Sequence, residues 1–129
     1  MVTKEEKVSF WLKGAKKDKK AAKVMYQSKH YDWCLFMWHL VLEKTLKAKI
    51  ASLDKPNPFI HNLVRISKIA GIKINEEEFD QLSEISTFNL NARYSEYKYN
   101  FYKKCNKSYT DKWLKICHSC FTKFRHQYD

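Results

Sequence analysis

Arg93 is the residue with the clearest chemical potential in this chain. It stands in the run Ala92-Arg93-Tyr94-Ser95-Glu96-Tyr97, where a predicted helix gives way to a basic, tyrosine-rich segment. A guanidinium presents its N–H donors in a fixed fork that matches the oxygens of a phosphate. No histidine lies between His61 and His118. Arg93 therefore has no neighbouring imidazole for an acid–base pair, and the pattern favours binding over catalysis.

Further candidate ligand-binding residues follow Arg93 at short intervals: Tyr94, Tyr97, Lys98 and Tyr99, with Tyr102 close behind. Aromatic rings stack on nucleobases of any sequence. Aromatic residues are also enriched in protein interfaces, and a dimer contact is the more frequent use of such rings. Arg93 has structural alternatives as well, because it can cap the preceding helix or pair with Glu43 or Glu96.

His39, Glu43 and Lys47 form a second polar set, spaced by four residues on a predicted helix. This spacing places the three side chains on one helical face. A histidine oriented by a carboxylate is a plausible general base, and a fold that brought His39 to Arg93 would supply the missing imidazole. An ion pair on a polar stripe is the commoner use of this spacing, so we treat the set as possible supporting residues. His61 is expected at the start of a short helix, without a chemical role.

The run Cys117-His118-Ser119-Cys120 has the two-residue spacing of a metal knuckle, and Cys105 and His126 are conceivable further ligands. The run lies inside a predicted helix, where both cysteines share the apolar stripe, and no second pair of this spacing exists. Unpaired cysteine behaves as a small hydrophobe, so buried free thiols are favoured. We therefore expect no metal site and no cofactor.

Only two glycines occur, Gly14 and Gly71, and these cannot form a P-loop or a dinucleotide-binding fingerprint. The paired metal-binding acids and the Gly-Ser turn of a nucleotidyltransferase are also absent. An autonomous nucleotidyltransferase is therefore excluded, and any such activity belongs to a partner.

The formal net charge of +11 is concentrated at the two ends of the chain. Residues 1–52 carry 12 Lys or Arg against 5 Asp or Glu, residues 53–92 carry 4 against 6, and residues 93–129 carry 9 against 3. Terminal helices packed side by side would form one positive face that attracts phosphates or an acidic partner. The charged start and four cysteines indicate the cytoplasm, and no stretch approaches the roughly 20 apolar residues that cross a bilayer.

Apolar residues at intervals of three and four predict an all-α protein: an up-and-down bundle of four longer helices and one short helix in a single domain, residues 1–129. The expected helices span 4–28, Asp32 to about Leu53, Asn62 to about Gly71, Asn75 to about Asn91, and about Thr110 to Phe124. The second helix is apolar around more than one face and should be central. Residues 92–108 show no clean period.

Several short motifs occur in a recognisable order along these elements. They are Trp11 and Ala15, Tyr31-Asp32-Trp33-Cys34-Leu35-Phe36, His39, Leu42-Glu43-Lys44-Thr45-Leu46-Lys47-Ala48, His61-Asn62-Leu63 and Ala92-Arg93-Tyr94. Their order and spacing over nearly the whole chain resemble the HEPN domain family, small helical proteins named for higher eukaryotes and prokaryotes nucleotide-binding. The resemblance implies an up-and-down helical bundle, usually a homodimer, often encoded beside a minimal nucleotidyltransferase.

The resemblance also implies a ribonuclease motif, because many members are metal-independent ribonuclease toxins that use an arginine, a polar residue, a few spacers and a histidine. Here Arg93 occupies the arginine position, Tyr94 replaces the polar residue, and Tyr97 and Tyr99 lie where histidine is expected. Moving the 2′-hydroxyl proton at neutral pH requires a group that titrates near 7, and the usual pKa of tyrosine is about 10. The chain therefore looks like the binding branch of the family.

Three functional hypotheses remain. The first is a noncatalytic HEPN-type module that binds a nucleotide or RNA phosphate around Arg93, partners a separate minimal nucleotidyltransferase, or does both. The second is a divergent ribonuclease of a toxin–antitoxin pair, in which His39 or a tyrosine supports Arg93. The third is a protein interaction or dimerisation module whose aromatic segment binds no ligand.

Overall fold

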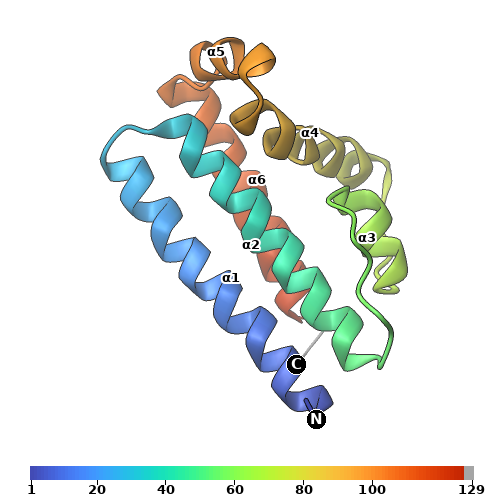
Figure 1. The fold of residues 1–129 in the computed structure, drawn as a ribbon. Coiled ribbons are helices and arrows are strands. Elements are labelled where there is room, and N and C mark those ends of the chain that lie inside the picture. The colour runs from blue at the N-terminus through green and yellow to red at the C-terminus, as the bar shows by residue number, and fades with distance from the viewer. Residues whose placement is uncertain (127–129) are drawn as a thin grey trace.

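The computed structural model describes residues 1–126 of the chain. Within that range the chain forms six α-helices and no β-strand (Figure 1). They are α1 (Lys4–Gln27), α2 (Tyr31–Ser52), α3 (Leu63–Ile69), α4 (Glu76–Arg93), α5 (Ser95–Lys104) and α6 (Lys107–His126). The predicted all-α bundle is confirmed, with α5 as a helix that the sequence pattern did not predict. None of the described helices is long and apolar enough to cross a membrane.

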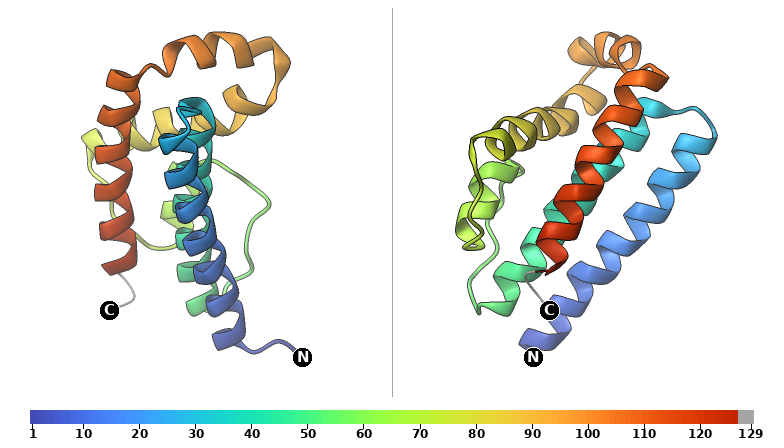
Figure 2. Two further views of the ribbon diagram at one scale, coloured as in Figure 1. Left: turned by 90° about the vertical axis from the view of Figure 1, so that its left-hand side faces the viewer. Right: turned by 180° about the vertical axis from the view of Figure 1, so that it is seen from behind.

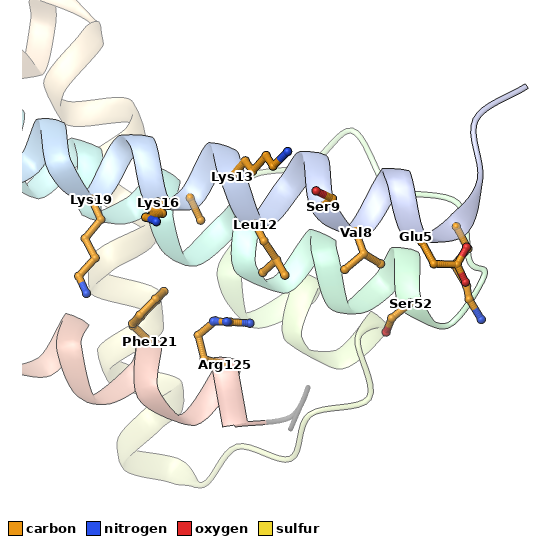
Figure 3. Close-up of a pocket in the computed structure, with 12 residues that line it drawn as sticks. Glu5, Val8, Ser9, Leu12, Lys13, Lys16, Lys19, Ser52, Phe121 and Arg125 are labelled. Atoms are coloured by element: carbon orange, nitrogen blue, oxygen red, sulfur yellow. The ribbon is translucent and has the colours of Figure 1, made fainter.

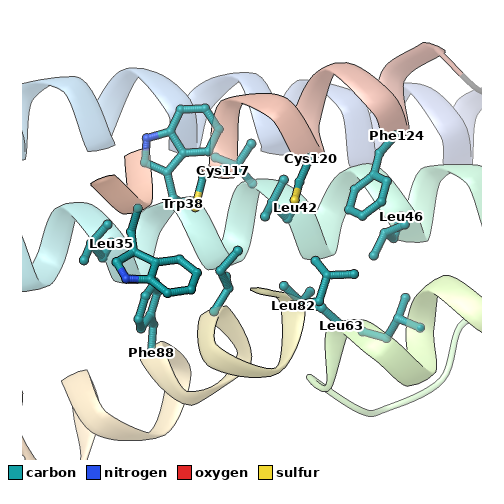
Figure 4. Close-up of a cluster of buried hydrophobic side chains, with 14 of the residues drawn as sticks. Leu35, Trp38, Leu42, Leu46, Leu63, Leu82, Phe88, Cys117, Cys120 and Phe124 are labelled. Carbon is teal, nitrogen blue, oxygen red and sulfur yellow. The ribbon is translucent and has the colours of Figure 1, made fainter. Parts of the chain in front are cut away.

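Helix α2 is the central element of the bundle, as its apolar surface predicted. It forms a hairpin with α1 and packs on its other sides against α4 and α6 (Figures 1 and 2). The core that these helices enclose contains large side chains without solvent exposure, among them Leu35 and Leu42 of α2, Phe88 of α4 and Phe124 of α6 (Figure 4). Burying such side chains supplies the main force that holds the helices together.

Helix ends follow local capping chemistry, and two of them differ from expectation. The Thr3 side chain caps α1 by accepting a hydrogen bond from the Glu6 amide, and Asn75 forms a capping box with Glu78 at the start of α4. Asp32 was expected to cap the second helix, but α2 begins at Tyr31 after His30 and places Asp32 inside its first turn. Helix α6 begins at Lys107 and not near Thr110, because Asn106 Oδ1 accepts a hydrogen bond from the Tyr109 amide at 2.8 Å.

Helix α5 crosses the end of the bundle at which α1 and α2 are joined (Figures 1 and 2). Phe101 is its one buried residue, and its ring centroid lies 5.4 Å from that of Phe88 on α4. A single anchoring residue leaves no apolar stripe in the sequence, which explains why this helix was not predicted. The same arrangement leaves most of the side chains of α5 in solvent.

Candidate functional site

The chain turns sharply at Tyr94, the residue that ends α4 and precedes α5. The Tyr94 carbonyl accepts hydrogen bonds from the amides of Tyr97 and Lys98 at 3.0 and 2.9 Å, and so starts α5 directly. Arg93 is the last residue of α4. The turn therefore brings the arginine to the start of α5, whose tyrosines and lysines are exposed. We call these exposed residues the α5 surface: Arg93, Tyr94, Tyr97, Lys98, Tyr99, Tyr102 and Lys103.

Arg93 is exposed and uses little of its hydrogen-bonding capacity within the protein. Its Nε donates to the carbonyl oxygen of Asn89 at 3.1 Å, which fulfils the predicted alternative of capping the preceding helix. Its guanidinium carbon lies 5.7 Å from the centre of the Tyr94 ring. No carboxylate of residues 1–126 forms an ion pair with Arg93, so the pairings considered with Glu43 and Glu96 do not occur. The terminal N–H groups are therefore available to a ligand.

The tyrosines of the α5 surface are all markedly exposed: Tyr94 by 52%, Tyr97 by 45%, Tyr99 by 67% and Tyr102 by 62%. Tyr99, Tyr102 and Lys103 share one face of α5, since they are three or four residues apart. The Lys103 ammonium lies 5.1 Å from the centre of the Tyr99 ring. The Lys98 ammonium instead lies 5.3 Å from the Trp33 ring of α2. The candidate ligand residues are therefore spread around the helix, and Tyr99 with Lys103 forms the most open part.

A second group of polar side chains surrounds the carboxylate of Glu43, and we call it the Glu43 cluster: His39, Glu43, Lys47 and His61. His39, Glu43 and Lys47 lie on one face of α2, as predicted. The Lys47 ammonium lies 3.1 Å from Glu43 Oε2, and the Glu43 and Lys47 side chains are only 6% and 8% exposed. Glu43 Oε1 lies 3.9 Å from His39 Nε2. This is a buried charged group, and its ion pair compensates the cost of removing the charges from water.

His61 completes the cluster, which the sequence pattern did not predict. It lies in the loop between α2 and α3, and its Nδ1 lies 2.9 Å from Glu43 Oε1. Because the carboxylate accepts, Nδ1 carries the hydrogen, and the Nε2 of this half-exposed ring is left to accept or donate a proton. A carboxylate that orients an imidazole in this way forms an acid–base dyad. The contact between His61 and Glu43 could not be predicted from residue spacing within one helix, because it depends on the path of the loop that brings His61 back to the middle of α2.

His39 is unsuited to the proton transfer that the sequence allowed for it, because its side chain is fully buried. Its Nε2 donates to the carbonyl oxygen of His61 at 3.0 Å, and its Nδ1 has no partner among residues 1–126. Burial lowers the pKa of His39 and outweighs the hydrogen bond to the His61 carbonyl and the charge of Glu43, which raise it. His39 is therefore a neutral residue with a structural role.

Acid should destabilise the fold through His39. Its pKa lies below 6.5 in the folded protein, so the unfolded chain binds the proton more readily, and this contribution to stability is present above pH 6.5 and lost as pH falls below it. The slope can reach about 1.4 kcal/mol per pH unit. Urea unfolding from pH 7.5 to pH 5 should show it. The slope should shrink in His39→Gln but persist in His30→Gln, which changes an exposed histidine; equal slopes in both variants would exclude this role.

The four cysteines are free and buried, as the helical pattern favoured. Burial raises the pKa of Cys34 and of Cys105 to about 12, and that of Cys120 to about 11. These thiols are therefore poor nucleophiles at neutral pH. No group of three His, Cys, Asp or Glu side chains that could hold a metal ion occurs within the part of the chain that the structure describes.

Comparison with known proteins identifies a family. The model of the HEPN domain family matches residues 8–126, which include all six helices almost completely as well as the α5 surface and the Glu43 cluster. No curated protein and no solved structure matches the chain.

Proposed function

The chain belongs to the HEPN domain family, and from that premise we propose that it is a noncatalytic member that binds the phosphate of a nucleotide or of RNA around Arg93. The observation that carries the proposal is the exposed guanidinium of Arg93, which lacks a carboxylate partner within residues 1–126 and lies 5.7 Å from the exposed ring of Tyr94. The net charge of +11 would draw phosphate-bearing ligands toward such a site.

Each part of the α5 surface has a role in this proposal. The Arg93 guanidinium donates to two phosphate oxygens at once. Tyr99, the most exposed tyrosine of α5, offers a ring for stacking on a base, an interaction worth about 1–3 kcal/mol per base. Lys103 beside that ring adds a positive charge that follows the phosphate backbone. Recognition of this kind depends on phosphate and aromatic stacking, so we expect little preference among base sequences.

The absence of catalysis is the part of the proposal that rests on the missing imidazole. The positions where the family motif has histidine hold Tyr97 and Tyr99. His39 is buried and donates its Nε2 hydrogen to a carbonyl oxygen, so it cannot reach a ligand. The α5 surface therefore offers groups for phosphate and base contacts but no histidine to move a proton.

A divergent ribonuclease is the second candidate, and one observation favours it. His61 is oriented by Glu43 through the contact of 2.9 Å, and its ring is 54% exposed. In that function His61 would accept the 2′-hydroxyl proton of RNA while Arg93 neutralised charge on the phosphate. The candidate differs from the earlier hypothesis in its proton carrier, since His39 and the tyrosines give way to His61.

Partners form the last part of the proposal. We propose a homodimer and a separate minimal nucleotidyltransferase as partner, both supported by membership of the family. The exposed tyrosines of α5 suit a protein contact as well as a base. If they served dimerisation alone, Tyr97→Ala and Tyr99→Ala would shift the oligomeric state and no nucleotide or RNA would bind.

Replacing Arg93 with alanine should weaken binding of labelled single-stranded RNA or of ATP at least tenfold, because a charge-assisted contact of this kind contributes about 1.5–3 kcal/mol. Fluorescence anisotropy at fixed ionic strength measures the dissociation constants. Arg65→Ala is the matched control, since Arg65 is an exposed arginine of α3 and its loss changes the net charge equally. Equal losses in the two variants would reduce the effect to overall charge and contradict a site at Arg93.

A further inference from the structure

A long groove lies between α1 and α6, with α2 beneath it, on a part of the molecule that neither the α5 surface nor the Glu43 cluster uses. It consists of two adjoining cavities of about 680 and 430 Å³, and Lys16 and Lys19 line both. Figure 3 shows side chains of α1 and α6 that face one another across the larger cavity. We call this feature the α1/α6 groove.

The floor of the groove is mainly apolar. Val8 and Leu12 of α1 face Phe121 of α6 in the larger cavity (Figure 3), which Ala15 also lines. In the smaller cavity the floor continues through Leu114 of α6, above the buried Trp38 of α2. Val8, Leu12, Leu114 and Phe121 are partly exposed, and an apolar strip of this kind with a polar rim is typical of a protein contact site.

The rim of the groove is strongly basic. It contains Lys4, Lys13, Lys16, Lys19, Lys20, Lys23 and Arg125, against the one carboxylate of Glu5. Among residues 1–126, no carboxylate lies within ion-pair distance of Lys13, Lys16, Lys20 or Lys23, whereas Lys44 and Lys123 elsewhere in the bundle are paired. These rim lysines therefore offer positive charge that the protein itself does not neutralise.

The dimensions of the groove match one helix. Its α1 wall extends from Lys4 to Tyr26, which at 1.5 Å per residue spans about 33 Å, the length of a helix of about 20 residues. Two side-chain contacts cross the groove: the Lys19 ammonium lies 4.8 Å from the Phe121 ring, and the Tyr26 hydroxyl donates to Asp111 at 2.6 Å. A bound helix would therefore lie on the outer side of α1 and α6, displace the flexible Lys19 side chain and complete a four-helix arrangement with α2.

We propose that the α1/α6 groove binds an amphipathic helix of a partner protein, with an apolar stripe on the floor and acidic flanks against the lysine rim. Charge complementarity selects this occupant. The aromatic rings of the groove are already in contact or buried, since the Lys19 ammonium lies 4.8 Å from the centre of the Phe121 ring and Trp38 is only 3% exposed. This leaves nucleobases little aromatic surface on which to stack, which disfavours RNA. A second copy placed with its own α1 in the groove would bring a further set of lysines and would be repelled. The proposal is independent of ligand binding at Arg93.

The test uses three labelled 20-residue helical peptides: one with a leucine stripe and glutamate flanks, one with the same stripe and lysine flanks, and one with glutamate flanks and glutamine in place of leucine. Anisotropy titrations with the whole chain should show binding of the first peptide at least tenfold tighter than either of the others. Higher salt should weaken that binding, because the rim charges are exposed.

Two matched variants locate the peptide. Lys16→Glu/Lys20→Glu reverses two rim charges and should weaken binding at least tenfold. Lys7→Glu/Lys17→Glu makes the same charge change on exposed residues of α1 outside the groove and should leave binding within about twofold of wild type. Arg93→Ala should also leave it unchanged, which separates this proposal from the one for the α5 surface.

Several outcomes would overturn the proposal. These are no binding of the acidic amphipathic peptide to the wild-type chain, equal binding of the acidic and basic peptides, or equal losses in the two double variants. Displacement of the peptide by RNA, with RNA affinity reduced in Lys16→Glu/Lys20→Glu and not in Arg93→Ala, would assign the groove to nucleic acid instead.

Discussion

Glu43→Gln should lower the free energy of unfolding by about 3 kcal/mol, although glutamine has nearly the same size as glutamate. The Glu43 carboxylate lies 3.1 Å from the Lys47 ammonium and 2.9 Å from His61 Nδ1, and its side chain is 6% exposed. Without that charge, the Lys47 ammonium remains buried without a compensating anion. Urea denaturation followed by circular dichroism measures the loss.

The control for Glu43→Gln is Asp54→Asn, because the Lys4–Asp54 pair is exposed and its atoms are 4.0 Å apart. Loss of an exposed pair should change stability by less than about 1 kcal/mol. The double variant Glu43→Leu/Lys47→Met removes both charges and should recover much of the stability lost in Glu43→Gln, since the uncompensated charge is what costs most. If Glu43→Gln were as stable as Asp54→Asn, the Glu43 cluster would not act as a buried ion pair.

Phe88→Ala should cost about 3–5 kcal/mol, the range for removing a buried phenylalanine ring. Phe88 has no solvent exposure, and its ring contacts Phe101 of α5 and Trp113 of α6, with centroid distances of 5.4 and 6.0 Å. Phe101 is the one buried residue of α5. The substitution should therefore loosen α5 in addition to weakening the core, and amide hydrogen exchange of residues 95–104 should rise more than that of α2.

Leu90→Ala is the control for this prediction, since Leu90 lies on the same helix and is 44% exposed. It should cost less than about 1 kcal/mol and leave hydrogen exchange of α5 unchanged. Rapid exchange of α5 already in the wild-type chain, with no increase in Phe88→Ala, would contradict the conclusion that Phe101 and Phe88 hold the helix in place.

The fold was largely predictable because most of its helices carry periodic apolar stripes. The positions of α1 and α2 in the sequence follow directly from this spacing, which is seen in Val8, Leu12 and Ala15 of α1 and in the apolar surface of α2. Gly71 ends α3 at a φ of 73°, a conformation that favours glycine, and this stop was also predicted. Helix α5 was not predictable in the same way, because Phe101 is its one buried residue and a single apolar position shows no periodicity.

The Glu43 cluster was predictable only where its residues share a helix. His39, Glu43 and Lys47 are four residues apart, so their common face followed from spacing. His61 joins them because the loop after α2 folds back, and no pattern in the sequence specifies the path of that loop. The side chain of His39 was assigned a possible proton-transfer role because its spacing does not report burial, whereas the structure places it wholly inside the core.

Incubation of the purified chain with labelled mixed-sequence RNA in the presence of a chelator, beside Arg93→Ala, tests the central claim most directly when cleavage and retention are scored together. We expect the wild-type chain to retain intact RNA and Arg93→Ala to lose that retention. Cleavage that depends on Arg93 would contradict the noncatalytic assignment and point to the Glu43–His61 dyad. RNA that is neither retained nor cleaved would contradict RNA binding at the α5 surface.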